Sequence, residues 1–254
     1  MLDTRDLAVV IGGKVLLSGL SLNVDLGENW AILGANGTGK SSLLRLLSGI
    51  DAPLKGRVLV DGVEMRTFSK KSLARQIGLL PQIEEDQYWG SVEEYVGLGR
   101  FSHAVGLWAK SDADQIMIQR ALENFDISSL SGRDYRSLSG GERQRARLAS
   151  LMAQDPQLFL WDEPLENLDY SGQMQFLSWV CELAGEKDKA SMMVVHDVNM
   201  VSRFFTHTLM VFADGTHLAG ACSETLTISN LEDLYQTRFD QVIHDGVRLF
   251  VPRV

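Results

Sequence analysis

The sequence has few of the features that mark secreted or membrane-spanning proteins. Its only two cysteines, Cys181 and Cys222, lie far apart and match neither a disulfide framework nor a metal-ligand spacing, so a reducing compartment is expected. Residues 1–6 carry charges where a signal peptide needs an apolar run, and no stretch reaches the roughly 18 apolar residues of a spanning helix. We therefore expect a soluble, cytosolic chain that reaches a membrane only through a partner.

Basic residues are also scarce, since 24 Lys and Arg stand against 33 Asp and Glu and give a net charge of −9. Proteins that bind nucleic acid usually present a basic surface, so no nucleic-acid partner is expected. Hydrophobic residues make up 45% of the chain and charged residues 22%, which is typical of a globular protein. A chain of 254 residues is long enough for a substantial core.

Short apolar runs and helical stretches alternate along the chain, with no internal repeat and no long linker. A turn is expected at Ser18 and Gly19, and hairpins over 56–63 and around Asp245 and Gly246. Residues 92–153 have helical periodicity that breaks near 128–138. Strands are expected at 7–10, 15–17, 20–24, 30–33, 77–80, 158–161, 192–195 and 209–212, and further helices at 41–47 and 174–183. This pattern predicts an α/β fold with a helical insertion.

Residues 34–41, with the sequence GANGTGKS, match the phosphate-binding pattern GxxxxGK[ST] in full and lie between an expected strand and an expected helix. Glycines let backbone N–H groups turn toward phosphates, and the helix that begins near Lys40 directs its positive end at them. Lys40 is expected at the β and γ phosphates, and the Ser41 hydroxyl at Mg²⁺. The expected nucleotide-binding residues are Gly34, Asn36, Gly37, Thr38, Gly39, Lys40, Ser41 and Ser42.

Asp162 and Glu163 follow the apolar run 158–161 directly. An acidic residue at the carboxyl end of a strand can hold Mg²⁺, directly or through water, and Glu163 could polarise a water that attacks the γ-phosphate. The alternative is a solvated acidic turn after a core strand. Beside a complete phosphate-binding loop, the metal site is the better interpretation.

A second anion-binding helix terminus is expected at 138–142, where the sequence is LSGGE. Ser139 and two glycines precede a helix, and one nucleotide does not need two such termini from the same chain. This second terminus is therefore expected to meet a nucleotide bound to another subunit. Arg143, Arg145 and Arg147 follow; a nucleic-acid contact is one interpretation, but a solvated or carboxylate-paired helix face is favoured by the negative charge.

With these motifs in this order, the whole chain resembles the ATPases of ABC transporters. Gln82 matches the Q-loop glutamine of that family, Leu168 and Asp169 the D-loop, and His196 the switch histidine. The resemblance implies a P-loop NTPase of ABC type, with a mixed central sheet, an antiparallel β subdomain and a helical subdomain. It implies one domain over 1–254, with the ATP-binding core in 1–82 and about 155–254 and the helical subdomain in about 83–154.

The resemblance also implies a head-to-tail dimer with two Mg-ATP at its interface. In such a dimer Glu163 would be the general base, His196 would contact the γ-phosphate, and Gln82 would organise water. Ser41, Gln82 and Asp162 would hold Mg²⁺. The partner chain's nucleotide would meet Ser139, Gly140 and Gly141.

Within the family, residues 96–103 and 106–108 and the tail from about 231 resemble the ATPases of iron-siderophore, haem and cobalamin importers. This implies integral-membrane permease subunits, an extracytoplasmic substrate-binding protein, and a peripheral location on the cytoplasmic face of the inner membrane. The alternatives are the ATPase of a two-component exporter, or a soluble ABC ATPase that acts on nucleic acid or ribosomes. No long heptad run or second cassette favours the soluble alternative.

The chain departs from the family at Ile11, where an aromatic residue usually stacks on adenine, and at Glu166, where the D-loop usually has serine. Trp161 is bulky for its position, and a core-filling role is expected. Residues 83–90 combine three acids with Tyr88 and Trp89, which are expected either to pack into the helical subdomain or to line a groove for a permease helix. The other histidines have no ligand spacing, so no metal is assigned to them.

Overall fold

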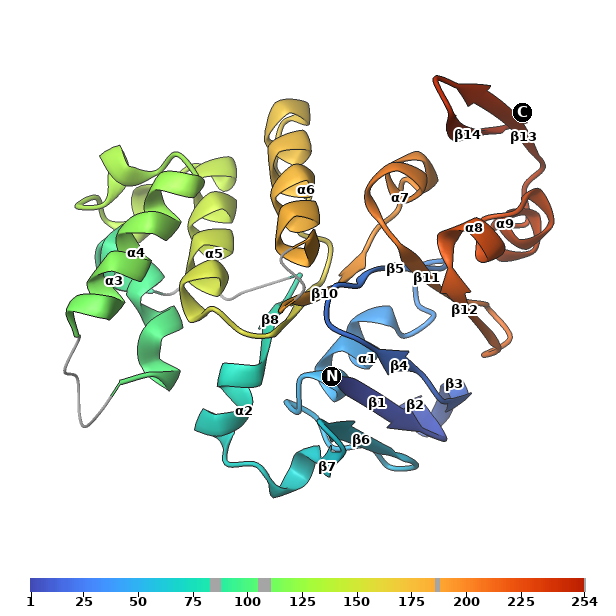
Figure 1. The fold of residues 1–254 in the computed structure, drawn as a ribbon, viewed down its shortest axis with the longest axis horizontal. Coiled ribbons are helices and arrows are strands. Elements are labelled where there is room, and N and C mark those ends of the chain that lie inside the picture. Colours follow the sequence, from blue (N-terminus) through green and yellow to red (C-terminus); the bar gives the residue numbers. More distant parts are fainter. Residues whose placement is uncertain (83–87, 105–110, 186–187, 254) are drawn as a thin grey trace.

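The computed structural model describes residues 1–82, 88–104, 111–185 and 188–253. Its main feature is a six-stranded sheet in the order β12-β11-β5-β10-β9-β8 (Figure 1), in which β11 and β12 are antiparallel and the other neighbours are parallel. These strands are β5 (Asn29–Leu33), β8 (Ile77–Leu80), β9 (Leu158–Trp161), β10 (Ala190–Val194), β11 (His207–Val211) and β12 (His217–Ala221). The mixed central sheet predicted from the sequence is confirmed.

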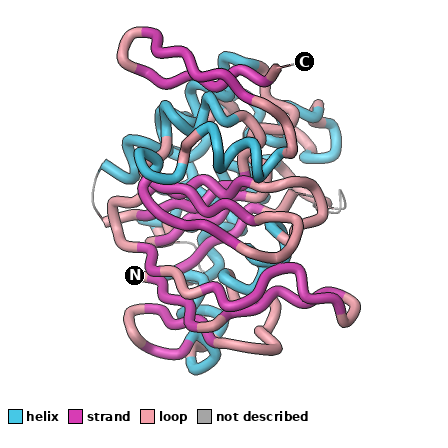
Figure 2. The backbone as a smooth tube through the Cα atoms, turned by 90° about the vertical axis from the view of Figure 1, so that its right-hand side faces the viewer, coloured by secondary structure: helices cyan, strands magenta, loops and turns pink. Residues whose placement is uncertain are grey.

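Antiparallel strands form a second layer beneath the central sheet (Figure 2). Four of them, β1 (Leu2–Arg5), β4 (Asn23–Val24), β6 (Arg57–Val60) and β7 (Val63–Glu64), pair in the order β4-β1-β6-β7, while β2 (Leu7–Ile11) and β3 (Lys14–Leu20) form a separate ribbon. A further ribbon of β13 (Phe239–His244) and β14 (Val247–Pro252), at the end of the chain, lies on the opposite side of the central sheet (Figure 2). Both predicted hairpins are present.

Helices α3, α4 and α5 gather at one end of the molecule, beyond the edge strand β8 (Figure 1). The α-helices are α1 (Lys40–Leu47), α2 (Lys70–Gln76), α3 (Val92–Gly97), α4 (Asp112–Asn124), α5 (Gly140–Gln154), α6 (Tyr170–Gly185), α7 (Val198–Phe204), α8 (Cys222–Thr225) and α9 (Ile228–Tyr235). Short 3₁₀ helices are η1 (Met65–Thr67), η2 (Leu98–Ser102), η3 (Ser128–Leu130) and η4 (Tyr135–Ser137). The predicted break near 128–138 therefore contains two 3₁₀ turns.

The central sheet is covered on both faces, and successive side chains of a strand point to opposite sides, so each strand contributes to two cores. On β9, Phe159 and Trp161 belong to the core under α5 and α6, while Leu158 and Leu160 belong to the core that contains α1. Apolar runs without alternation, such as those of β5, β9 and β10, are what a strand buried on both faces requires. The carboxyl ends of these strands carry the site residues.

Trp161 fills the core, as predicted from its position. Its side chain is fully buried, stacks on Phe159 with ring centres 5.3 Å apart, and meets Phe176 edge-on at 5.1 Å. This aromatic packing fixes the end of β9 immediately before Asp162.

The turn predicted at Ser18 and Gly19 is wrong. Strand β3 runs through both residues to Leu20, and Gly19 has a positive φ of 70° where the pairing of β2 with β3 shifts register. Glycine there accommodates a bulge, which a sequence pattern cannot distinguish from a turn. Among the described residues, no helix is long and apolar enough to cross a membrane.

Candidate functional site

The phosphate-binding loop joins β5 to α1 and curves around the Lys40 side chain. Gly34 has φ 156°, and a Cβ there would lie 2.5 Å from the Val211 carbonyl oxygen, so β11 excludes any other residue. Gly39 has φ 94° and caps α1 without a side chain, which leaves the first N–H groups of the helix open to an anion. The local sequence therefore builds an anion site from backbone alone.

Lys40 is 6% exposed, and its ammonium donates to the carbonyls of Gly34 and Ala35, both at 2.9 Å. Burial lowers the pKa of Lys40, while the nearby carboxylates of Glu163 and Asp162 oppose that shift. The ammonium thus lies in the curve of the loop, at the position from which it can bind phosphate oxygens.

Ser41 and Asp162 bring two oxygens together from α1 and from the end of β9. The Ser41 hydroxyl donates to Asp162 Oδ1 at 3.1 Å. Burial raises the pKa of Asp162, and its hydrogen bond with Ser41 opposes the rise. Oxygens that share an octahedral Mg²⁺ at about 2.1 Å lie about 3 Å apart, so this pair fits that ion.

Gln82, Glu163 and His196 meet beyond the ends of three neighbouring strands, β8, β9 and β10. Glu163 Oε2 accepts from Gln82 Nε2 at 2.9 Å, and Glu163 Oε1 lies 3.0 Å from His196 Nε2. Glu163 has a left-handed backbone with φ 53°, which turns its side chain off the strand and into this cluster. Both carboxylate oxygens are held by groups that sequence reasoning placed at the site.

These residues surround a cleft of about 650 Å³. Of the predicted nucleotide and catalytic residues, Asn36, Gly37, Gly39, Lys40, Ser41, Ser42, Gln82, Glu163 and His196 line it. Gly34 and Asp162 adjoin it through their hydrogen bonds with Lys40 and Ser41, and Thr38 is buried in the loop. Ile11 and Leu16 form its apolar wall, and Ile11 is half-exposed. The structure thus places an aliphatic side chain where the resemblance noted in the sequence predicts an aromatic one.

Glu166 is a cleft residue that the sequence did not reveal as one. It lines the same cleft, and Gln82 Nε2 lies 3.5 Å from its Oε1. Burial raises the pKa of Glu166, and its hydrogen bond with Glu163 raises it further. The sequence showed that Glu166 replaces the usual serine. Whether its side chain reaches the cleft depends on the conformation of the turn over 163–167.

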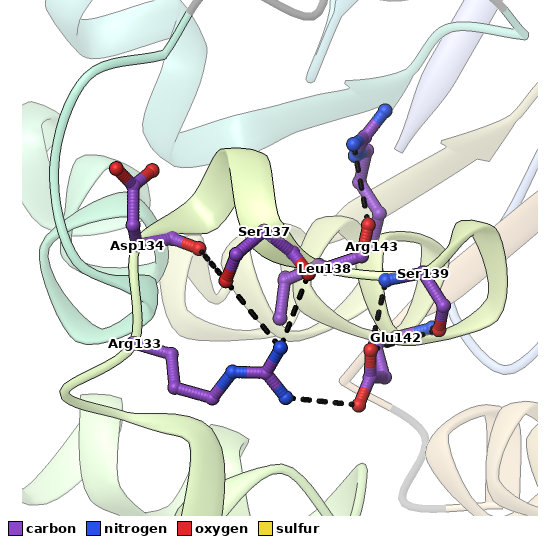
Figure 3. Close-up of polar contacts among 7 residues, drawn as sticks. All are labelled: Arg133, Asp134, Ser137, Leu138, Ser139, Glu142 and Arg143. Carbon is purple, nitrogen blue, oxygen red and sulfur yellow. Dashed lines mark hydrogen bonds and ion pairs between the residues drawn. The ribbon is translucent and has the colours of Figure 1, made fainter.

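The second predicted anion site, formed by Ser139, Gly140 and Gly141 and here called the signature terminus, lies apart from this cleft at the start of α5. Ser139 caps the helix: its backbone N–H and its hydroxyl both donate to Glu142 Oε2 at 2.8 Å, and its hydroxyl accepts from the Glu142 N–H (Figure 3). Ser139 and Gly140 are exposed. Neither these two residues nor Gly141 lines the described cleft, so the structure does not bring the two predicted anion sites of one chain together.

The sequence predicted a solvated or carboxylate-paired arginine face, and the solvated form of that prediction is wrong for Arg147. This side chain is buried, and it donates to the Pro81 carbonyl and, at 2.8 Å, to Gln144 Oε1. Gln144 in turn donates to the Pro164 carbonyl at 2.7 Å. Arg147 therefore ties α5 to the backbone just before Gln82.

Of the aromatic pair after Gln82, Tyr88 packs into the helical subdomain and Trp89 does not. Tyr88 is half-buried against the rings of Tyr95 and Tyr135, with centres 5.3 and 5.9 Å away. Trp89 is 75% exposed, and the Arg136 guanidinium stacks 3.8 Å from its ring centre. Residues 83–87, which hold the three acids, lie outside the described residues.

Comparison with known proteins finds the same family over most of the chain. The family model described as "ABC transporter" matches residues 17–166. The chain is 36% identical to the hemin import ATP-binding protein HmuV of Bordetella avium, over 96% of this chain and 95% of that one. It is 33% identical to the iron(3+)-hydroxamate import ATP-binding protein FhuC of Bacillus subtilis, over 92% and 87%.

Solved structures agree with the sequence relatives. A chain from an inward-facing ABC transporter provisionally assigned to the metal-chelate type superposes with a TM-score of 0.84. It is 28% identical, and the alignment covers 100% of this chain and 97% of that one. The predicted fold class, with its mixed sheet, antiparallel β layer and helical insertion, is confirmed.

Proposed function

Since this chain belongs to the ABC transporter family of ATP-hydrolysing, ATP-binding proteins, we propose that it is the ATPase subunit of an importer and works as a head-to-tail dimer around two Mg-ATP. The importer would take up a metal chelate, haem or a cobalamin-like cofactor through a separate permease. The family itself carries ATP binding and hydrolysis; the dimer, the direction of transport and the cargo are the proposal.

Each residue of the cleft has a role that fits its position. Lys40 and the N–H groups at the start of α1 bind the β and γ phosphates, and Ile11 and Leu16 lie against the base. Ser41, Asp162 and Gln82 would hold Mg²⁺, which neutralises developing charge on the phosphates when bound. Glu163 accepts a proton from the attacking water, and His196 orients that carboxylate and contacts the γ-phosphate.

The observation that carries the dimer is the separation of the two anion sites. Residues 139–141 present an exposed helix terminus that does not line the chain's own cleft. A second copy in head-to-tail arrangement places that terminus on the first copy's nucleotide, and each ATP then contacts both chains. ATP therefore stabilises the closed dimer, and the dimer opens after hydrolysis because ADP does not stabilise it. This difference between ATP and ADP in affinity for the closed dimer drives the movement of the permease.

Trp89 supports a permease contact near the start of α3. A large exposed aromatic side chain that is held by a stacked arginine is a suitable anchor for a short partner helix. The subunit would then sit at the cytoplasmic face of the inner membrane through its permease, with a substrate-binding protein on the other side. The net charge of −9 and the match to single-cassette import proteins over nearly their whole length favour this over a soluble ATPase acting on nucleic acid or ribosomes.

The direction of transport separates the importer from the exporter alternative. The chain would be reconstituted in liposomes with a permease that co-purifies with it, and ferric hydroxamate, haem and cobalamin would be offered in turn. We expect ATP-dependent movement of one of them toward the side that carries the ATPase. Movement away from that side would identify an exporter, and ATP hydrolysis without any effect of the permease would favour a soluble ATPase.

A further inference from the structure

Arg133 holds the segment that leads into the signature terminus. Its guanidinium donates to the Ser137 carbonyl at 3.1 Å and to the Ser137 hydroxyl at 3.4 Å through Nη2 (Figure 3). Through Nη1 it donates to Glu142 Oε1 at 3.4 Å. One side chain thus contacts a residue before Ser139 and a residue after it. Arg133 is not among the site residues assigned above.

The backbone around Arg133 is anchored to the start of α3. The Arg133 carbonyl accepts from the Val92 N–H at 3.0 Å, and the Gly90 carbonyl accepts from the Tyr135 N–H at 3.0 Å. Gly90 directly follows Trp89, the proposed permease contact. The Arg133 main chain therefore lies against one functional surface while its side chain reaches the other.

The Glu142 carboxylate explains why this contact matters for Ser139. Its Oε2 accepts both the N–H and the hydroxyl of Ser139, so the orientation of the carboxylate sets the orientation of the serine. Oε1 is the oxygen that Arg133 binds. Ser139 itself is exposed, so its geometry depends on these polar contacts.

We propose that Arg133 is a positioning residue for the signature terminus, holding Ser137 and Glu142 so that Ser139, Gly140 and Gly141 are already arranged to receive the nucleotide bound by the second copy. The inference rests on the proposed dimer. Arg133 touches no nucleotide in this account; its loss leaves the chain's own cleft intact and impairs the cleft of the partner. A loss confined to the partner's cleft distinguishes a positioning role of Arg133 from a general contribution to the stability of its own chain.

A mixed dimer with one working site reveals the asymmetry. One chain carries Lys40→Ala and the other Ser139→Arg, so both lesions meet in one site, and the other site pairs an intact phosphate-binding loop with an intact signature. Arg133→Ala is then added to the Lys40→Ala chain, which supplies the working signature, or to the Ser139→Arg chain, which supplies the working loop. ATP hydrolysis is measured over a range of ATP concentrations.

We expect activity to fall about threefold to tenfold in the first arrangement, the scale of a lost charge-assisted hydrogen bond at a partly exposed position, and to stay unchanged in the second. Arg133→Lys, which keeps a charged donor, should restore part of the loss. Arg66→Ala is the matched control, because Arg66 is also exposed and donates to a glutamate, Glu64, at 2.6 Å, and it belongs to η1 rather than to the segment that leads into the signature terminus. It should have no effect in either chain.

An equal loss in both arrangements, a loss only in the second, or no loss in either would overturn the proposal. If Arg133→Ala does not fold, Arg133→Lys decides the question in the same two arrangements. A baseline mixture without activity would refute the proposed dimer, and the role of Arg133 with it. An active baseline in which Arg133 has no positional effect would refute the positioning role alone.

Discussion

Replacing Glu163 with glutamine removes the proposed general base with little change of shape. The side chain is 14% exposed and both its oxygens are engaged, with Gln82 Nε2 at 2.9 Å and His196 Nε2 at 3.0 Å. Glutamine keeps one acceptor oxygen, and Gln82 can turn its amide to accept from the new NH₂ group. The cluster therefore persists, and the variant should fold.

The expected loss is in hydrolysis. A positioned general base contributes about 10² to 10⁴ in rate, or about 2.7 to 5.4 kcal/mol of the activation barrier. ATP binding should change little near neutral pH, because Lys40 and the start of α1 hold the phosphates without using Glu163. Glu163 does oppose the lowered pKa of Lys40, so ATP binding by the variant should decline at a lower alkaline pH than in the native chain.

Three measurements check this prediction: phosphate release at saturating ATP, nucleotide affinity by fluorescence, and size-exclusion chromatography with ATP. The variant should bind ATP, hydrolyse it at least about 10² more slowly, and elute as a dimer that persists. Glu163→Asp keeps the charge but withdraws it by one methylene, and it should fall between the two. Turnover of Glu163→Gln within a few-fold of the native rate would assign the base to another group.

Four further substitutions test three separate parts of the account. Without an aromatic face at Ile11 the cleft lacks roughly 1 kcal/mol of stacking energy, so ATP and GTP should bind with similar affinity. Ile11→Tyr should increase the affinity for ATP, and a strong preference of the native chain for ATP would contradict this reasoning. Trp89→Ala should leave the activity of the isolated ATPase unchanged but abolish its stimulation by the permease, and undiminished stimulation would exclude Trp89 as a permease contact. Tyr88→Ala removes a packed ring and should instead lower the melting temperature. Trp161→Ala should cost about 3 to 5 kcal/mol of unfolding free energy in denaturant titration, and a loss below about 1 kcal/mol would contradict its place in the core.

Much of the central site was predictable because its parts are local. A strand, a glycine loop and a helix follow one another over 29–47, and Asp162 and Glu163 follow a strand whose apolar run shows that it is buried. The carboxyl ends of parallel strands meet at one edge of a sheet, so the residues that follow these strands are expected to form the site together.

Glu166 and Arg147 show where prediction from sequence stops. Glu166 reaches the cleft because Glu163 and Asn167 both adopt left-handed backbone, with φ 53° and 62°, and this turn is not specified by residue type alone. Arg147 lies in an arginine-rich segment that is typical of a solvent-exposed helix face, yet its side chain is buried and donates to the Pro81 carbonyl, which is distant in sequence. Arg133 is similar, since its partners are set by the fold of two 3₁₀ turns rather than by spacing.

The central claim is that two copies of the chain share each ATP. Mixing the Lys40→Ala and Ser139→Arg chains tests it most directly, since each homodimer has two defective sites while the mixed dimer has one intact site. The account predicts that both homodimers are inactive and that an equal mixture recovers about one quarter of native activity, because half of the dimers are mixed and each has one of two sites. A mixture no more active than either homodimer would contradict the shared site.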